Sequence, residues 1–363
     1  MSRTRRSRSG LAVYAITLAA LASSSPSEAS DAIGGVLGKG RVDSAVSYSV
    51  TDLGVIQRIS ADVMPGLSPA GHFVITQQME SGAFTGVYGN GSTQRTLTHP
   101  PGFLNSFAYS VNDSGRAVGW SNSTRNPVDS ASTVHATLFT VDGARDLGTL
   151  GGPRSCAYAI NSANIIVGVA DLPDHRRRAF RFADGKMVAL PPLVGGNYSA
   201  AFDVNDAGDV VGASEFGSPT AKPSIHAVLW HGSELKDLGT LSHTGNSIAY
   251  AINNQGDVVG VSDSALGERV FLYADGKIKD LNIRGHAFAI NDRRQIVGTI
   301  TPAERSRPRG FLWEHGELRD LDNLIPPNTW HIETVYRVND RGQLLCSGYG
   351  NGNLHALLLN PQD

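Results

Sequence analysis

The chain has 363 residues, a formal net charge of −2 at pH 7, 18% charged residues and 41 glycines. This slightly acidic balance argues against a nucleic-acid-binding protein, whose phosphate contacts require a basic surface. Few charges and many glycines favour short strands and tight turns over long solvent-exposed helices. The length is enough for one large β domain or two smaller ones.

The N-terminus has the features of a secretory signal peptide, which we assign to residues 1–29. The basic segment Arg3–Arg8 precedes an apolar run, Leu11–Ala22. That run is shorter than the roughly 20 residues of a membrane-spanning helix, so we prefer a cleaved signal to a membrane anchor. Ser27-Glu28-Ala29 offers small residues for cleavage. We expect export to the periplasm or the extracellular space, no stable membrane insertion afterwards, and a flexible linker over residues 30–46.

Residues 226–262 predict four short strands in series. The expected strands are 226–230, 235–238, 248–252 and 258–262, and β-branched and aromatic residues recur in all but the second. A turn at His231-Gly232 and another at 253–256 separate the strands of each hairpin. We name these strands C and D, followed by A and B of the next unit. The rest of the chain after residue 47 repeats this pattern in degenerate form.

The A–B hairpin follows one template: aromatic, any residue, aliphatic, Asn, two residues, Gly, any residue, two aliphatics, Gly. The template asparagines are Asn112, Asn161, Asn205, Asn253, Asn291 and Asn339. The aromatic residues three positions earlier are Tyr109, Tyr158, Phe202, Tyr250, Phe288 and Tyr336. The closing glycines are Gly119, Gly168, Gly212, Gly260 and Gly298, with Cys346 in the last copy. An aromatic and an aliphatic residue two positions apart share one face of a strand.

Strand D ends in a leucine, and these leucines give the number of units. They are Leu53, Leu97, Leu147, Leu190, Leu238, Leu281 and Leu321. The interval from such a leucine to the next template asparagine is 15 residues for Leu97 and Asn112. The same interval after Leu53 leads to Ser68, which marks a degenerate first copy without asparagine. The sequence therefore contains seven units.

The order of strands at the two ends of the chain predicts ring closure. The first strand, Tyr48–Leu53, is a D strand without a C strand, and the last, His355–Leu359, is a C strand without a D strand. We predict an all-β fold: a single seven-bladed β-propeller over residues 47–363, its last blade closed by the N-terminal strand. Such closure removes exposed sheet edges. Six or eight blades would require a misread unit near 82–101 or 301–309.

The two cysteines fall in blades that are not neighbours in this arrangement. Cys156 lies in strand A of blade 3, and Cys346 in strand B of blade 7. A disulfide needs Cα atoms within about 7 Å. We therefore expect two buried free thiols that behave as small apolar residues.

Three motifs resemble the bacterial extracellular repeats called the HAF family. They are DLGTLGG at Asp146–Gly152, AINNQGDVVG at Ala251–Gly260, and His-Ala at the start of strand C. The resemblance covers 48–360 and implies an exported repeat protein without an assigned chemistry. The His-Ala copies begin at His135, His226 and His355, whereas Arg178, Arg269 and Arg309 replace the histidine in other blades.

The recurring polar residues favour structural roles. Asn-Asp-x-Gly, as at Asn205–Gly208, offers one carboxylate per turn, whereas calcium takes six to eight oxygens, so we interpret it as a turn. We expect the strand C His or Arg to bond a loop carbonyl. Gly148–Gly152 lacks the helix of a phosphate-binding loop. The sequence predicts no metal site and no cofactor.

The loops that vary in length, D–A and B–C, lie on one face of a propeller, and a rigid scaffold with variable loops favours binding there. The predicted ligand-binding residues are Arg154, Asn197, Tyr198, His243, Arg284, Trp330 and His331. The B–C loops add His175, Arg176, Arg177, Arg305 and Arg307. Aromatic rings beside hydrogen-bonding groups suit a sugar or an acidic polymer.

We therefore predict a monomeric, exported, non-catalytic binding or adhesion module for a glycan, an envelope polymer or a protein, and no nucleic-acid partner. The alternative is a propeller hydrolase or lyase whose site is assembled from loop residues of several blades. Clustered inward carboxylates of raised pKa on the loop face would favour the enzyme, and a shallow aromatic pocket without them would favour the binding module.

Overall fold

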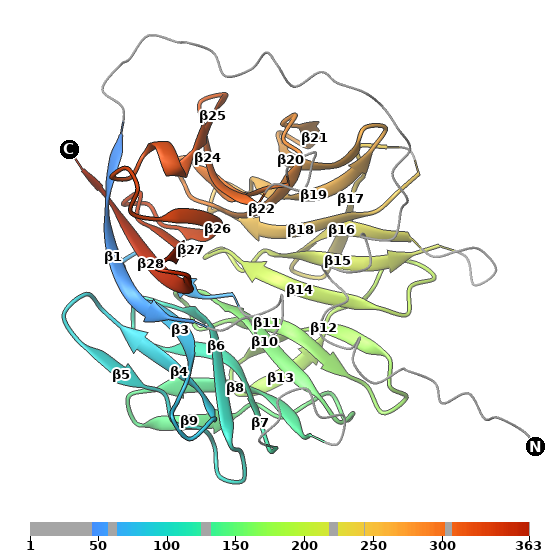
Figure 1. The fold of residues 1–363 in the computed structure, drawn as a ribbon. Coiled ribbons are helices and arrows are strands. Elements are labelled where there is room, and N and C mark those ends of the chain that lie inside the picture. Colours follow the sequence, from blue (N-terminus) through green and yellow to red (C-terminus); the bar gives the residue numbers. More distant parts are fainter. Residues whose placement is uncertain are drawn as a thin grey trace, which may run out of the picture.

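The structure, a computed structural model, describes residues 46–56, 64–124, 132–217, 224–242, 244–301 and 307–362. The described chain forms seven four-stranded antiparallel sheets. The sheets are arranged in a ring, as Figure 1 shows, and we call the axis of this ring the channel. The predicted seven-bladed propeller is therefore confirmed. The predicted signal peptide, residues 1–29, and the linker apart from Val46 lie outside the described residues. Within those residues, no helix has the length and apolar character of a membrane span.

The first three blades follow one another along the chain, with strand A innermost and strand D outermost. Blade 1 comprises β2 (Gly66–Leu67), β3 (Phe73–Gln78), β4 (Phe84–Gly89) and β5 (Gln94–Thr96). Blade 2 comprises β6 (Asn105–Val111), β7 (Ala117–Asn122), β8 (Val134–Thr140) and β9 (Gly143–Asp146). Blade 3 comprises β10 (Ser155–Ile160), β11 (Ile166–Asp171), β12 (Arg177–Ala183) and β13 (Lys186–Ala189).

The next three blades repeat this order, and a short 3₁₀ turn, η1 (Leu321–Asn323), follows the last of them. Blade 4 comprises β14 (Ser199–Val204), β15 (Val210–Phe216), β16 (Ser224–His231) and β17 (Glu234–Gly239). Blade 5 comprises β18 (Ser247–Ile252), β19 (Val258–Ser264), β20 (Gly267–Ala274) and β21 (Lys277–Asp280). Blade 6 comprises β22 (Gly285–Ile290), β23 (Ile296–Ile300), β24 (Arg309–Glu314) and β25 (Glu317–Asp320).

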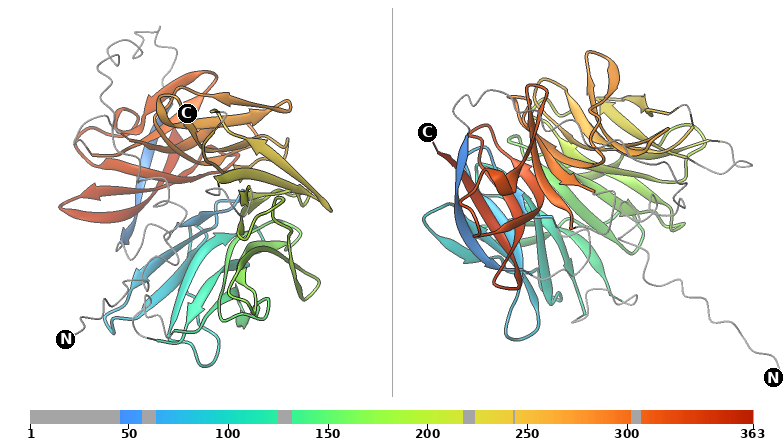
Figure 2. Two further views of the ribbon diagram at one scale, coloured as in Figure 1. Left: turned by 90° about the vertical axis from the view of Figure 1, so that its right-hand side faces the viewer. Right: turned by 45° about the horizontal axis from the view of Figure 1, so that its top comes forward.

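Blade 7 joins the two ends of the described chain. It comprises β26 (His331–Val338), β27 (Leu344–Gly350), β28 (Asn353–Gln362) and β1 (Ser47–Val55). β1 pairs antiparallel with β28 from Ser47 opposite Gln362 to Val55 opposite His355. Figure 2 shows the blue N-terminal strand alongside the red C-terminal one. The predicted closure by the first strand is therefore confirmed, and it pairs what would otherwise be open sheet edges.

A bulge in strand A explains the closing glycine of the repeat. In blade 3 the register shifts between Ala157 and Ala159, which leaves Tyr158 in the bulge. The bulge brings the carbonyl oxygen of Cys156 to 2.0 Å from where a Cβ of Gly168 would be. The closing glycines of blades 2, 4, 5 and 6 show the same approach, at 1.8 to 2.0 Å. In these five blades only a residue without a side chain fits at this position. In blade 7, where Cys346 takes the position, strand A has an additional register shift between Ile332 and Thr334.

The core lies between blades, where apolar faces of neighbouring sheets pack together. One cluster joins Val118 and Ala136 of blade 2 to Ile160 and Phe180 of blade 3. Phe180 is fully buried, and burying a side chain of this size stabilises the fold by about 2–3 kcal/mol. The aliphatic position of the template, Ile160 here, therefore seals one blade against the previous one.

Both thiols are buried and free, which confirms the prediction. Burial raises the pKa of the Cys346 thiol well above its ordinary value. A buried thiol of raised pKa stays protonated and is a poor nucleophile. Cys346 therefore contributes packing rather than reactivity.

Candidate functional site

The template asparagines form a hydrogen-bonded ladder around the channel. Within its own turn, the Oδ1 of Asn205 accepts from the Asp209 N–H at 2.9 Å. Across the blade boundary, its Nδ2 donates to the Asn253 carbonyl at 3.2 Å. The same bond, from a side-chain Nδ2 to the backbone carbonyl of the next template asparagine, occurs four more times at 2.9 to 3.2 Å. It joins Asn112 to Asn161, Asn161 to Asn205, Asn253 to Asn291 and Asn291 to Asn339. Asn339 donates to the Ser68 carbonyl at 3.2 Å. The predicted turn is present, but the sequence interpretation missed the ladder.

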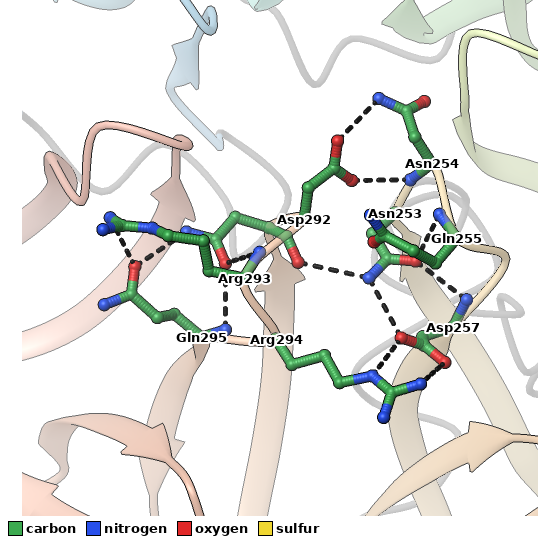
Figure 3. Close-up of polar contacts among 9 residues, drawn as sticks. Asn253, Asn254, Gln255, Asp257, Asp292, Arg293, Arg294 and Gln295 are labelled. Carbon is green, nitrogen blue, oxygen red and sulfur yellow. Dashed lines mark hydrogen bonds and ion pairs between the residues drawn. The ribbon is translucent and has the colours of Figure 1, made fainter.

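The residue after each template asparagine extends this contact between blades. The Oδ1 of Asp292 accepts from the Asn254 N–H at 2.8 Å, and its Oδ2 accepts from the Asn254 side chain at 3.0 Å, as Figure 3 shows. Equivalent bonds from a backbone N–H to an aspartate Oδ1 measure 2.8 to 3.1 Å. They run from Ser162 to Asp206, from Asp292 to Asp340 and from Ala70 to Asp113. The described residues contain no group of three or more His, Cys, Asp or Glu placed to hold a metal ion.

These turns surround a cavity of about 330 Å³ at one end of the channel, which we call the mouth cavity. Residues of all seven blades line it. Four carboxylates stand at its rim, those of Asp113, Asp206, Asp292 and Asp340. One layer deeper, at the unconstrained position of the template, Asp203 of blade 4 and Arg337 of blade 7 face the same space.

Asp203 is held by backbone groups of two blades. Its Oδ1 accepts from the Val204 N–H at 2.9 Å, and its Oδ2 accepts from the Ile252 N–H at 3.0 Å. Burial raises the pKa of this carboxyl to about 6, against the opposing effects of those hydrogen bonds and of the Arg337 charge. Asp203 is half-buried, and it lines the mouth cavity.

Arg337 has a single hydrogen bond to protein within the described chain, from Nη1 to the Tyr336 carbonyl at 2.9 Å. Burial lowers the pKa of its guanidinium, and the Asp203 charge acts in the opposite direction. Because both oxygens of Asp203 accept backbone bonds, the carboxylate is held in place. The remaining guanidinium N–H groups of Arg337 are therefore available to the mouth cavity.

The template aromatics form a girdle around the channel. Ring centroids of successive blades lie 5.4 to 6.4 Å apart from Tyr109 to Tyr336. The girdle follows strand A, the innermost strand, whose copies contact each other around the ring. Tyr250 and Phe288 of this girdle also line the mouth cavity. They give its inner wall an apolar, aromatic character.

The strand C histidines have a partner that differs from the predicted loop carbonyl. His226 Nδ1 lies 2.8 Å from Asp237 Oδ2, on strand D of the same blade. The same pair joins His135 to Asp146, His355 to Asp52 and Arg309 to Asp320, at 2.7 to 3.0 Å. The prediction of a loop carbonyl is therefore wrong for these blades. In blade 3, Arg178 does donate to a loop carbonyl, that of Asn197.

The same aspartate explains the DLG motif. The other oxygen of Asp237 accepts from the Gly239 N–H at 2.8 Å, which closes the turn after strand D. Although burial opposes ionisation, the bonds from His226 and from that N–H lower the pKa of Asp237. Aromatic rings cover the histidines, as in the contact of Phe216 with His226 at 5.0 Å. These groups therefore fix the outer edge of each blade.

The predicted ligand-binding residues that the structure describes come from four D–A connections, and several are packed into the protein. Trp330 lies against Gly350 and meets the His355 ring at 5.0 Å. His331 uses both ring nitrogens, toward Asp322 at 2.7 Å and the Pro308 carbonyl at 3.0 Å. Trp330 is thereby engaged within blade 7, and His331 joins the entry loop of blade 7 to the B–C loop of blade 6.

The other predicted residues differ in exposure. Tyr198 is half-buried and packs against an inter-blade cluster. Arg154 is also half-buried, whereas Asn197 and Arg284 are exposed. His243 lies outside the described residues.

On the B–C loops, charged pairs and a ring contact hold the described arginines. The Arg176 and Asp174 side chains are 2.5 Å apart, and Arg177 lies 3.4 Å from Asp171. Arg307 lies over the Tyr349 ring at 5.5 Å. His175 takes a positive φ of 62° in its turn, and Arg305 lies outside the described residues. The binding role of this loop face stays a prediction.

The sequence interpretation missed Asp203 and Arg337. They occupy the template position that accepts any residue, and elsewhere that position holds Ser110 or alanine. A charged residue at this strand A position in two blades could have pointed to them. That interpretation requires knowing that the position faces the channel.

Comparison with solved structures identifies similar propellers. The β-propeller domain of the Trilobed protease from Pyrococcus furiosus superposes with a TM-score of 0.56 at 9% identity, over 87% of this chain and 95% of that one. The acylaminoacyl peptidase of Pyrococcus horikoshii gives 0.53 at 13% identity, over 86% of this chain and 51% of that one, so this chain spans about half of that enzyme.

TolB from Acinetobacter baumannii gives a TM-score of 0.43 at 15% identity, over 80% of this chain and 79% of that one. The chain matches no family model and no curated protein. At these identities the first two similarities show the fold alone. This chain shares the β-propeller fold of those two peptidase propellers.

Proposed function

We propose that this chain is an exported, non-catalytic binding module whose ligand occupies the mouth cavity. The observation that carries the proposal is the cavity itself, lined by residues of all seven blades. A concave site with a few converging polar groups is the usual form of a small-ligand site.

The construction of the rim supports binding. The rim carboxylates and the asparagine ladder are fixed by hydrogen bonds between blades, such as the one from the Asn291 side chain to the Asn339 carbonyl at 2.9 Å. Groups fixed before a ligand arrives lose little conformational entropy when it binds. The ring therefore acts as a preorganised frame for a ligand.

The repeated acid–base residues support a binding module over an enzyme. Each pair of the kind formed by His226 and Asp237 holds strand D against strand C of its own blade. Those aspartates also close the next turn, as the bond from the Gly239 N–H shows. These groups thus have structural work at the outer edge, away from the cavity.

Export remains the expectation drawn from the basic and apolar N-terminal segment. The resemblance to exported HAF repeats supports it. The ligand of such a module is a glycan, an envelope polymer or a protein, or a smaller compound related to one of them.

The proposal is tested by screening the purified mature chain against glycans, envelope polymers and small metabolites by calorimetry. Arg337→Gln alters the mouth cavity, and Asn197→Ala with Arg284→Ala alters the loop face. We expect a saturable ligand whose affinity falls about tenfold or more in the cavity variant and is unchanged in the loop variant. Loss in the loop variant alone would move the site to the opposite face. Turnover of the ligand would establish the hydrolase or lyase alternative.

A further inference from the structure

The charges of the mouth cavity point to a ligand class, and this inference rests on the proposed function. We propose that the cavity binds a small zwitterion, a free amino acid or a short peptide. Its carboxylate would meet the Arg337 guanidinium, and its ammonium group would meet the rim carboxylates.

The carboxylate half of the proposal rests on the unused donors of Arg337. A guanidinium carries five N–H donors in a planar fork that matches a carboxylate. Here one bond is made, to the neighbouring Tyr336 carbonyl. Within the described chain no ion pair joins Arg337 to Asp203, whose oxygens accept backbone bonds from Val204 and Ile252. Although the Asp203 charge acts on Arg337, the other guanidinium donors of Arg337 make no hydrogen bond within the described chain and can meet a carboxylate in the cavity.

The ammonium half rests on the rim. The Oδ1 of Asp340 accepts from the Asp292 N–H at 2.8 Å, and the Oδ1 of Asp113 accepts from the Ala70 N–H at 2.8 Å. Within the described residues, the second oxygens of Asp113 and Asp340 have no hydrogen bond to protein, whereas that of Asp292 accepts from Asn254. An ammonium group carries three donors and needs such acceptors.

The balance of charge distinguishes a zwitterion from simpler ions. Among the described residues, five carboxylates and one guanidinium line the cavity, those of Asp113, Asp203, Asp206, Asp292, Asp340 and Arg337. The negative charge of the rim carboxylates would repel a simple anion before it reached Arg337. A simple cation would satisfy the rim and leave the deeper guanidinium unpaired. A molecule with opposite charges at its two ends satisfies both layers.

The aromatic wall adds a preference within this class. Tyr250 and Phe288 line the cavity beside the charged layer. Their faces favour an apolar side chain or methylene chain between the two charges. The volume of about 330 Å³ also favours a compact molecule over a long polymer.

The test is calorimetric titration of the mature chain with L-amino acids, di- and triglycine, and ω-amino acids of increasing chain length. Each binding compound is compared with its N-acetylated form, which removes the ammonium charge, and with its C-terminal amide, which removes the carboxylate. We expect each blocked form to bind about tenfold or more weakly than the zwitterion. Equal binding of the three forms would overturn the inference.

Variants assign each charge to its layer. Arg337→Gln should weaken the zwitterion about tenfold and leave the C-terminal amide unchanged, and Arg337→Lys should keep part of the affinity. Asp340→Asn keeps the Oδ1 acceptor and should weaken the zwitterion but not its N-acetylated form. Arg319→Gln, on an outer strand, and Asp142→Asn, in an outer turn, are matched controls that should leave the affinity for the zwitterion unchanged. Thermal melts of all variants verify folding, and Arg337→Lys keeps the test decisive if Arg337→Gln unfolds.

The outcomes separate the inference from the proposed function. If a glycan or polymer binds in an Arg337-dependent way and no zwitterion binds, the ligand class is wrong and the cavity site stands. If ligands bind independently of Arg337 and Asp340, both the ligand class and the cavity site fail.

Discussion

The inner ring and the outer edge of the propeller both carry residues that repeat in the sequence, yet these residues hold the protein together differently. On the inner ring, each template asparagine donates to the next blade, as from Asn205 to the Asn253 carbonyl at 3.2 Å. On the outer edge, each aspartate of the DLG motif binds within its own blade, as Asp237 does with His226 at 2.8 Å.

This difference shows that what a repeated residue stabilises depends on where its hydrogen-bond partner lies. A partner in the next blade stabilises the ring, and a partner in the same blade stabilises that blade. Inner bonds cross the boundary between blades, so their loss affects the closure of the whole ring. Outer bonds are local and partly exposed, and such charged contacts contribute little to stability. Substitutions on the inner strand are therefore expected to cost more than matched substitutions on the outer strands.

The largest expected effect comes from the contact between the closing glycine and the bulge. Gly168→Ala would place a Cβ 2.0 Å from the Cys156 carbonyl oxygen. We expect a loss of about 3 kcal/mol or an insoluble protein, because backbone atoms cannot move aside as a side chain does. Denaturant unfolding measures it.

Gly185→Ala on the outer turn of the same blade is the control. That glycine has a φ of 77° and open space around it, so alanine should cost only about 1 kcal/mol. Equal losses at the two positions would contradict the close backbone contact that we assign to the bulge.

The next effect compares the two repeated polar residues within blade 4. Asn205→Ala removes an in-turn bond and an inter-blade bond at a buried site. We expect a loss of about 2 kcal/mol. His226→Ala removes a partly exposed pair on the outer strand, with an expected loss of about 0.5–1 kcal/mol. The free energies of unfolding in urea measure both, and a larger loss for His226→Ala would reverse our ranking.

A smaller effect is the pH dependence of the outer pair. The pKa of Asp237 is lowered in the folded state, so its stabilisation is complete above the ordinary aspartate value. It is lost as the pH falls through the lowered folded value. Asp237→Asn should therefore melt below the wild type at pH 7, by an amount equivalent to about 0.5 kcal/mol, and the difference should disappear as the pH falls through the lowered folded pKa. A difference that stays constant with pH would show that the charge is not responsible.

The smallest expected effect is a change in the pKa of Asp203, which lines the mouth cavity. The carboxyl of Asp203 should titrate with a pKa of about 6 in the wild type. In Arg337→Gln its pKa should rise further, because the Arg337 charge lowers it. Carbon-detected NMR of the aspartate carboxyls follows both. A midpoint near 4 would place Asp203 in open solvent rather than in an enclosed lumen.

The fold could be predicted because each unit has its own turn signals and alternating apolar pattern. Ser68, fifteen residues after Leu53, was enough to reveal the degenerate first blade, and the pairing of β1 with β28 confirms the closure. The closing glycine was visible as a repeat, but its cause was not. That cause is a bulge, and a bulge appears only when two strands are aligned.

The site was harder to predict because its contacts depend on how blades are oriented. The partner of each asparagine side chain lies in the next blade, 38 to 49 residues away for five of them and 271 residues away for Asn339. The partner of His226 depends on the register between strands C and D, which placed Asp237 beside it. Asp203 and Arg337 occur once each, so a repeat template gives them no weight.

The most direct test of the account is a crystal structure of the mature chain with the tightest-binding compound from the titration series. The account predicts electron density in the mouth cavity, with the ligand carboxylate within hydrogen-bond distance of the Arg337 guanidinium and its ammonium group facing Asp113 or Asp340. Density on the D–A loop face, with the mouth cavity holding only water, would contradict it.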